Sequence, residues 1–282
     1  MKSTRNIFIN GIIIFTLLLT SGCSAAVTEP TVSAQPEAAG ETSELVVFAA
    51  ASLTESFSDI ASLFEEQHAG VKVQINFVSS AQLAQQLANG AAADVYASAN
   101  EKQMQVAVDS GRISADQVAE FVNNKLTLAF PKDNPANISS LEDLAKPGIK
   151  LVICAKEVPV GNYALQYLAL ASTSKFYGTD YQDKVLANVV SYETDVKAAV
   201  AKVALGEADA GIVYASDLMG TQAEQIGQLA IPTELNPRAV YVIAPVNDSH
   251  NSQLANDFVQ FVLSDAAQNV FANYGFQPVQ AK

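Results

Sequence analysis

The pattern of apolar positions first becomes regular at Leu45–Phe48, a run without alternation that predicts a strand buried on both faces of a sheet. Three alanines, Ala49–Ala51, follow the run and lead to Ser52. Ser52 and Glu55 match the S-x-x-E pattern of a capping box, which predicts that a helix begins here. The helix would bury one face at helical spacing, with Leu53, Phe57, Ile60 and Phe64.

The same change from strand to helix recurs along the chain. Alternation predicts a strand over 71–77, and short apolar runs predict others at 94–99, 126–130, 151–155, 189–192, 210–214, at Ile231 and at 240–243. Helical spacing predicts helices after Ser80, over 101–109, after Gly161, after Asp195 and over 252–273, with a short one over 140–144. This order predicts an α/β fold with mostly parallel sheets flanked by helices, in two units of about 110 residues.

Ligands of open α/β sheets bind beyond the carboxyl ends of the strands, where helices begin. The junctions predicted by the pattern therefore make candidate ligand positions of Ser52, Ser80, Val160–Gly161, Asp195–Val196 and Tyr214. Backbone N–H groups at such helix starts suit an anion. For any one serine the simpler interpretation is a helix cap and nothing more. Equivalent junctions in both halves of the chain favour a shared site.

The first residues predict export. Lys2 and Arg5 precede the apolar stretch 7–19, which is too short to span a bilayer, so residues 1–22 are interpreted as a signal peptide. The end of this stretch resembles a bacterial lipobox with Cys23 as the lipidated residue, although Thr20 stands where leucine is usual. The alternative is conventional cleavage near Ala25. Residues 23–43 are rich in small and polar residues and predict a disordered tether.

Charge and cysteine content narrow the range of possible ligands and partners. The chain has a net charge of −13, and without Lys2 and Arg5 it has 14 basic against 29 acidic residues, a net of −15. This excess argues against nucleic acid and against anionic lipid as partners. The same excess opposes an anionic ligand, unless neutral dipoles hold that ligand. Once Cys23 is set aside, Cys154 remains alone in an apolar run and is interpreted as a core residue.

Catalytic patterns are missing from the sequence. His68 and His250 lie in polar contexts without ligand-spaced partners, which argues against a metal site and against a Ser-His-Asp triad. Neither a G-x-S-x-G elbow nor a G-x-x-x-x-G-K phosphate loop occurs. The acid pairs Glu65–Glu66 and Glu142–Asp143 read as solvated helix faces. We therefore expect a protein that is not an enzyme and carries no cofactor.

Several segments together resemble the molybdate-binding protein of bacterial molybdate ABC transporters, within the type II periplasmic binding proteins. They occur in the family's order: Val47–Thr54, Ser79–Ala84, Ala93–Ala99, Val158–Gly161, Asp195–Val196, Gly211–Asp217 and Tyr274–Phe276. The resemblance implies a two-lobed type II periplasmic-binding-protein fold, with lobe 1 at 44–127 and 241–282 and lobe 2 at 128–240. The two crossings between lobes would lie near 126–130 and 238–242.

By the same resemblance, the oxyanion lies between the lobes. Ser52 and Ser80 would bind it through hydroxyl and backbone N–H, Val160 and Val196 through backbone N–H, and Tyr214 through its hydroxyl. Molybdenum would be held only as molybdate, through these five residues. Ala81 stands where the family often has a third serine, so an extra cap contact is not expected there.

The resemblance implies a monomeric receptor for molybdate or tungstate that serves the permease of an ABC transporter. The lipobox-like segment adds a lipid anchor at Cys23, on the outer side of the bacterial cell membrane. A site with donors alone disfavours an anion that keeps a proton, such as hydrogen phosphate. It does not separate molybdate and tungstate from sulfate, so a receptor for another tetrahedral oxyanion is the alternative. An exported serine hydrolase and a surface protein without transport function are further alternatives, the first weakened by the missing base.

Overall fold

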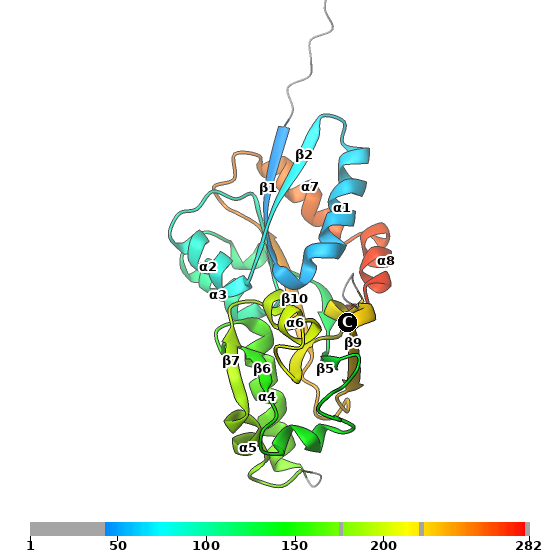
Figure 1. Cartoon of the computed structure of the whole chain (residues 1–282). Helices are drawn as coiled ribbons and strands as arrows, with labels where there is room; N and C mark the ends of the chain where they lie inside the picture. Colours follow the sequence, from blue (N-terminus) through cyan, green and yellow to red (C-terminus); the bar gives the residue numbers. More distant parts are fainter. Residues whose placement is uncertain (1–42, 175–176, 220–222, 280–282) are drawn as a thin grey trace, which may run out of the picture. The chain divides into compact units, whose positions relative to one another are not determined.

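The computed structural model describes residues 43–174, 177–219 and 223–279. The predicted signal peptide with Cys23, and the predicted tether up to residue 42, lie outside the described residues. The strands are β1 (Ser43–Ala50), β2 (Val71–Val78), β3 (Val95–Ser98), β4 (Ala119–Asn124), β5 (Leu126–Pro131), β6 (Leu151–Cys154), β7 (Val189–Glu193), β8 (Ala210–Tyr214), β9 (Ile226–Ala230), β10 (Ala239–Pro245) and β11 (Gln277–Pro278). Figure 1 shows their arrangement.

The α-helices are α1 (Thr54–Gln67), α2 (Ser80–Ala88), α3 (Glu101–Asp109), α4 (Pro159–Thr173), α5 (Tyr181–Ala187), α6 (Val196–Ala204), α7 (Ser252–Val262) and α8 (Asp265–Asn273). Short 3-10 turns are η1 (Ala51–Leu53), η2 (Ala115–Gln117), η3 (Leu141–Ala145), η4 (Ala215–Leu218) and η5 (Ala223–Gln225). Three of these turns or helices, η1, α2 and η4, begin within two residues of a strand end, so little chain separates a strand from its helical element.

The first sheet has the strand order β11-β4-β10-β3-β1-β2. β1 runs parallel to both β2 and β3, as its unbroken apolar run predicts. β10 runs antiparallel to β3 and β4. α1, α7 and α8 pack together beside this sheet (Figure 1). Between them Phe57 packs edge to face against Phe121 and Phe258, with ring centroids 5.9 and 6.1 Å apart.

The second sheet has the order β7-β6-β8-β5-β9. β6 runs parallel to β7 and β8, whereas β5 runs antiparallel to β8 and β9. α4 and α6 pack against its central strands (Figure 1). The α/β class with helix-flanked sheets is therefore confirmed. Both sheets are mixed, because β5 and β10, the strands that arrive from the other sheet, pair antiparallel with their neighbours.

Two short links join the sheets. The first is the single residue Lys125, between the end of β4 and the start of β5. The second spans residues 231–238, between β9 and β10. Asn236 on the second link accepts a hydrogen bond from Leu126 N–H at 2.9 Å and donates one to Leu126 C=O at 2.8 Å. The links are thus tied to each other. The predicted lobe boundaries stay a prediction at this point.

Three local expectations were wrong or incomplete. The helix predicted over 252–273 is two helices, because Ser264 caps a new helix start by accepting from Ala267 N–H at 3.5 Å. The turn over 141–145 is a 3-10 helix, with the Asp143 carboxylate accepting from Ser139 and Ser140 N–H at 2.7 and 3.0 Å. β4, β11 and α5 were not predicted, and the strand expected at Ile231 lies just before that residue, as β9.

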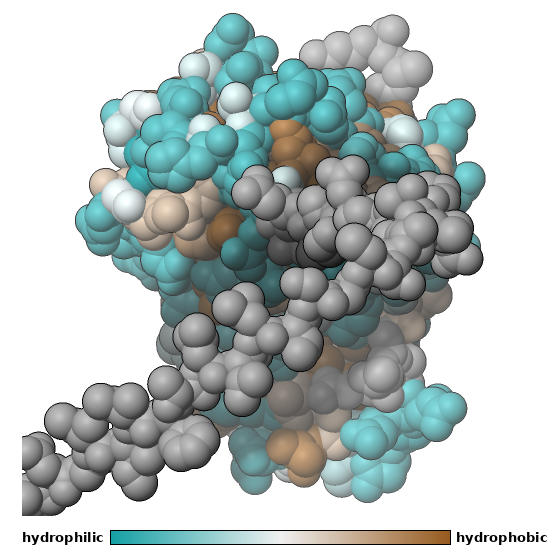
Figure 2. All heavy atoms as spheres, turned by 90° about the horizontal axis from the view of Figure 1, so that it is seen from above, coloured by the Kyte–Doolittle hydropathy of each residue, from teal (hydrophilic) through white to brown (hydrophobic). Residues whose placement is uncertain are grey.

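Most charged side chains of the described chain lie on its surface. Polar side chains predominate on the face shown in Figure 2, with the apolar ones in small separate areas. The buried charged residues of the described chain are Asp94, Asp143, Glu193 and Asp217. In residues 43–174, 177–219 and 223–279, no helix has the length and apolar character needed to cross a membrane.

Candidate functional site

All five ligand positions predicted from the sequence line one small cavity, of about 10 Å³. Ser52, Ser80, Val160, Val196 and Tyr214 come from five strand-to-helix junctions, three of them on the second sheet. The remaining lining residues are small or apolar, apart from one further serine: Ala50, Ala51, Ser79, Ala99, Val158 and Pro159. About 10 Å³ is close to the least space that holds one water molecule, so the walls lie close together.

Ser52 and Ser80 form the wall on the side of the first sheet. Ser80 Oγ accepts a hydrogen bond from Ala99 N–H at 2.9 Å, which leaves its own proton free to point elsewhere. Ser52 Oγ lies 2.8 Å from the Tyr241 hydroxyl. The cap of α2 is Ser79, whose hydroxyl accepts from Gln82 N–H at 3.4 Å. Ser80 is therefore not occupied in capping its helix.

Val160 and Val196 stand in the first turns of α4 and α6. Backbone N–H groups in a first turn have no acceptor within their own helix. α6 is capped by Asp195, which accepts from Ala198 N–H at 3.0 Å. α4 has no side-chain cap, and Pro159 holds its first position. Gly161 lets α4 approach β6, since a Cβ there would lie 2.2 Å from Ala155 O.

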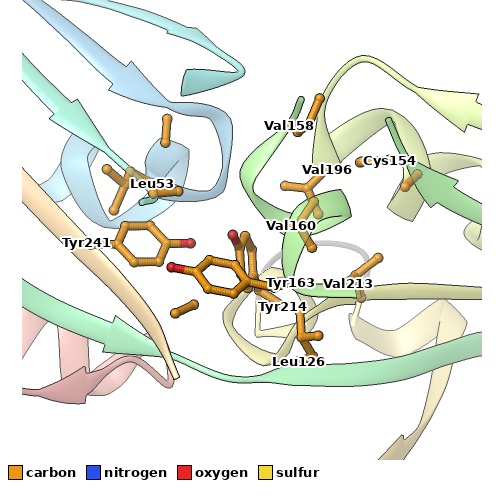
Figure 3. Close-up of a cluster of buried hydrophobic side chains, with 14 of the residues drawn as sticks. Leu53, Leu126, Cys154, Val158, Val160, Tyr163, Val196, Val213, Tyr214 and Tyr241 are labelled. Atoms are coloured by element: carbon orange, nitrogen blue, oxygen red, sulfur yellow. The ribbon is translucent and has the colours of Figure 1, made fainter. Parts of the chain in front are cut away.

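Tyr214, at the end of β8, supplies the remaining polar group. Its side chain is fully buried, and its hydroxyl has no hydrogen-bond partner among the described residues. Burial raises the pKa of Tyr214 well above its usual value, so the hydroxyl stays protonated and can donate. In Figure 3 the rings of Tyr163, Tyr214 and Tyr241 lie between Leu53 and Val160, with their hydroxyl groups near one another.

None of the described residues that line the cavity carries a charge. Lys197, directly after Val196, turns away from it: its Nζ lies 2.7 and 3.0 Å from the Glu55 carboxylate oxygens and 3.4 Å from Asp217 Oδ1. Burial opposes charge on Lys197, but the carboxylates of Asp217 and Glu55 outweigh it and raise the Lys197 pKa. Burial also raises the pKa of Asp217, to about 6. The walls of the cavity thus present dipoles and not ions.

The sequence patterns missed several residues that support this cavity. Tyr241 and Asn124 form the layer behind Ser52. The sequence marks Tyr241 only as a polar group within an apolar strand, and Asn124 only as a polar residue between two apolar runs. The capping box predicted for Ser52 and Glu55 does not form: neither η1 nor α1 has a hydrogen bond from a side-chain cap. Ser52 instead contacts Tyr241, and Glu55 pairs with Lys197.

Other candidate chemistry lies away from the cavity. His68 Nδ1 contacts Phe64 C=O at 2.9 Å, and His250 borders a separate hollow of about 640 Å³ near Glu44 and Arg112. Cys154 is buried, and burial raises the pKa of its thiol well above the usual value. Across the described segments, no group of three or more His, Cys, Asp or Glu side chains could hold a metal ion.

Two helix-flanked sheets, joined by two short links and presenting helix starts to one cavity, define a solute-binding protein. The match to known families agrees: residues 45–277 fit the model of the bacterial extracellular solute-binding proteins, and this chain belongs to that family.

The relatives and solved structures most similar to the chain include several oxyanion-binding proteins. The molybdate-binding protein ModA of Mycobacterium tuberculosis is 34% identical over 232 residues, 82% of this chain and 84% of the relative. The putative ABC transporter substrate-binding lipoprotein YvgL of Bacillus subtilis is 30% identical over 98% of this chain and 99% of its own. These relatives confirm the family resemblance.

Two solved structures show the fold. The periplasmic molybdate-binding protein of Azotobacter vinelandii has a TM-score of 0.72 at 22% identity, covering 84% of this chain and 100% of its own. The sulfate-binding protein SubI of Mycobacterium tuberculosis has a TM-score of 0.76 at 22% identity, covering 84% and 88%. At this identity the likeness concerns the fold and does not separate one oxyanion from another.

Proposed function

We propose that this protein captures molybdate or tungstate in the cavity described above and passes the anion to the permease of an ABC transporter. The observation that carries the proposal is the unpartnered Tyr214 hydroxyl, fully buried beside two serine hydroxyls and two helix starts. An unpaired buried hydroxyl costs free energy, and an anion that accepts a hydrogen bond from it removes that cost.

Ser52, Ser80 and Tyr214 donate through their hydroxyls in this proposal, and Val160 and Val196 donate through backbone N–H. A dianion held in this way needs no Lys or Arg, because the N-terminal ends of helices carry partial positive charge. The net charge of −15 then belongs to the outer surface and does not oppose binding locally. Molybdenum enters as the oxyanion, with no further cofactor.

The proposal includes two lobes that close on the ligand: 44–127 with 241–282, and 128–240. The two sheets and the two links, Lys125 and 231–238, support this division. Polar contacts join residues on opposite sides, since Gln103 Nε2 donates to Glu157 C=O at 2.7 Å and Lys197 pairs with Glu55. Separation of the lobes would break these contacts and open the cavity.

A purely donating site favours anions without protons, which supports molybdate, tungstate and sulfate over hydrogen phosphate. The name of the Mycobacterium tuberculosis relative, a molybdate-binding protein at 34% identity, supports molybdate over sulfate. The arrangement does not support hydrolysis, because the hydroxyl partners of Ser52 and Ser80 are Tyr241 and Ala99 N–H, and neither is a general base.

The proposed setting is the outer side of a bacterial cell membrane, with the monomeric protein anchored by lipid at Cys23. The position of Cys23 after an apolar stretch supports this, as does the lipoprotein name of the Bacillus subtilis relative, which matches nearly the whole chain. Incorporation of labelled lipid into the wild type and into Cys23→Ala tests the anchor. Equal labelling of the two proteins would contradict it.

Calorimetric titration of the chain from residue 24 tests the ligand. We expect molybdate and tungstate to bind, and at 100 times the Kd to stabilise the fold by about 2.7 kcal/mol. That stabilisation corresponds to a rise in Tm of roughly 5–10 °C for a protein of this size. Sulfate should bind far more weakly. Equal affinity for sulfate and molybdate would refute the choice of ligand and favour the alternative oxyanion receptor.

Two variants test the site. Ser80→Ala and Tyr214→Phe each remove one donor to a charged acceptor, which is worth roughly 1.5–3 kcal/mol, so each should weaken binding by roughly 10- to 150-fold. Tyr167→Phe is the matched control, because Tyr167 is buried and its hydroxyl bonds that of Tyr181, away from the cavity. If both site variants bind molybdate as tightly as this control does, the residue assignment is wrong.

A further inference from the structure

The hydroxyl of Ser52 has a neighbour that decides which way its proton points. Ser52 Oγ lies 2.8 Å from the hydroxyl of Tyr241, a fully buried residue of β10. At that distance either oxygen could donate. The direction of the bond therefore depends on what else bonds to Tyr241, and the only other bond to it among the described residues comes from Asn124.

Asn124 is the last residue of β4, and its amide orientation is fixed by the chain itself. The backbone N–H of Lys125 donates to Asn124 Oδ1 at 2.9 Å, and a backbone N–H is always a donor. The amide nitrogen must then face the other way. There Nδ2 lies 2.8 Å from Ser216 Oγ and 3.3 Å from the Tyr241 hydroxyl. An amide nitrogen donates only, so the Tyr241 oxygen accepts from it.

Asn124 Nδ2 cannot accept the Tyr241 proton, and Ser52 Oγ is the one other hydrogen-bond partner of Tyr241 among the described residues, so that proton is directed to Ser52 Oγ. Burial raises the pKa of Tyr241, so the hydroxyl keeps that proton. The ring centroid of Tyr214 lies 5.7 Å from that of Tyr241, and the Tyr214 hydroxyl has no hydrogen-bond partner among the described residues. Ser52 Oγ thus accepts from Tyr241, and its remaining proton faces the cavity. Ser80 reaches the same state by accepting from Ala99 N–H.

We propose that Asn124 and Tyr241 are positioning residues that form a one-way chain of hydrogen bonds, which makes Ser52 a donor toward the cavity and never an acceptor. The chain runs from Lys125 N–H through Asn124 and Tyr241 to Ser52. It would make the site select anions that carry no proton. This inference rests on the proposed function and extends it, because it names the residues that decide the ligand's protonation state.

A double-mutant cycle tests the chain. Molybdate affinity is measured by calorimetry in the wild type, Tyr241→Phe, Ser52→Ala and the double variant. Tyr241→Phe releases Ser52 to rotate, so we expect binding to weaken roughly tenfold. In the Ser52→Ala background the same change should weaken binding less than twofold, because there is no hydroxyl left to orient. Tyr167→Phe again controls for the loss of a buried tyrosine hydroxyl.

Asn124→Asp reverses the chain with almost no change in shape. The new carboxylate accepts a hydrogen bond from the Tyr241 hydroxyl. The Tyr241 oxygen then accepts one from Ser52, so Ser52 turns a lone pair toward the cavity. We expect this variant to lose more affinity for molybdate than Tyr241→Phe does, at least 100-fold. Thermal unfolding without ligand reports whether the variant folds. If it does not fold, the cycle at Tyr241 and Ser52 decides the question alone.

Competition between molybdate and hydrogen phosphate gives a readout that packing damage would not move. In Tyr241→Phe the ratio of phosphate to molybdate affinity should rise, since a free Ser52 can accept the phosphate proton. Two results would overturn the chain of hydrogen bonds. One is that Tyr241→Phe weakens molybdate binding by the same factor with and without the Ser52 hydroxyl, and the other is an unchanged ratio of phosphate to molybdate affinity. A wild type that binds no oxyanion would instead overturn the proposed function, so the two failures are distinguishable.

Discussion

Replacing Lys197 with methionine should destabilise the protein increasingly as the pH rises from 5 to 8. Lys197 is the cation closest to Asp217, whose side chain is completely buried and whose Oδ1 makes no hydrogen bond. The separation of 3.4 Å between Nζ and Oδ1 is longer than a charge-assisted hydrogen bond, so the attraction is mainly coulombic. Without Lys197, Asp217 keeps only the N–H of Tyr214, at 3.2 Å.

The pH dependence follows from the pKa of Asp217. Burial raises that pKa from 3.8 to about 6 in the folded protein, despite the nearby Lys197. A carboxyl with a raised folded pKa favours folding at pH values below its unfolded pKa, and this contribution is lost as the pH rises through 3.8 to 6. Removing Lys197 raises the folded pKa further, so the loss continues above pH 6.

Protonation of Asp217 sets an upper limit on the stability that Lys197→Met loses, since a neutral carboxyl needs no cation beside it. If Asp217 stays neutral in the folded variant, the added cost is 1.36 kcal/mol for each pH unit above 6, or about 1.4 kcal/mol at pH 7 and about 2.7 kcal/mol at pH 8. At pH 5 this added cost is close to zero. Loss of the half-exposed pair with Glu55 adds a constant of at most about 1 kcal/mol. Lys197 itself stays charged throughout this range, because its pKa is raised.

Urea unfolding of the ligand-free protein at pH 5, 6, 7 and 8 measures the difference between wild type and Lys197→Met. Two controls separate the contributions. Glu55→Gln should give a small deficit that does not grow with pH, and Lys197→Met combined with Asp217→Asn should remove the growth. A deficit for Lys197→Met that is the same at pH 5 and pH 8, or larger at pH 5, would refute the assignment to Asp217.

Three further predictions concern the cavity and the core. Gly161→Ala should destabilise the fold by roughly 1–3 kcal/mol in urea unfolding and weaken molybdate binding in calorimetry, because its Cβ would collide with Ala155 O at 2.2 Å and displace the start of α4. Ala51→Leu should fill the cavity and abolish molybdate binding in the same titration, with an unfolding transition still present without ligand. Phe57→Ala should cost roughly 3–5 kcal/mol in urea unfolding and leave the Kd for molybdate unchanged, since its ring packs against other phenylalanines away from the cavity.

The residues at the five junctions could be predicted because local signals place them. An apolar run followed by small residues and a helix start marks the end of a buried strand, and carboxyl ends of parallel strands meet at one edge of a sheet. Ser52, Ser80 and Tyr214 follow from that reasoning without knowledge of the strand order. The strand order itself could not be predicted, because it depends on pairings between distant segments. β10, for example, lies between β3 and β4, although more than a hundred residues separate it from either strand in the sequence.

Elements with mixed patterns were missed for the same reason. β4 carries Glu120, Asn123 and Asn124 beside three apolar residues, and neither alternation nor a long apolar run marks it as a strand. Its polar side chains have partners from distant parts of the chain: Asn123 Oδ1 accepts from Arg238 Nε at 2.8 Å, and Asn124 binds Ser216 and Tyr241. Partners of this kind make buried polar groups tolerable, and a local pattern contains no record of them.

The S-x-x-E pattern at Ser52 shows how such distant partners change the meaning of a motif. At Ser140 and Asp143, where serine and an acidic residue have the same spacing, the cap forms, since Asp143 accepts the N–H groups of Ser139 and Ser140. At Ser52 and Glu55 it fails, because Tyr241 and Lys197, 189 and 142 positions away, take the two side chains instead. The start of α1 is left without a side-chain cap. Uncapped N–H groups need an acceptor, and those beside Ala51 and Ser52 border the cavity, so an anion held there would act as the missing cap.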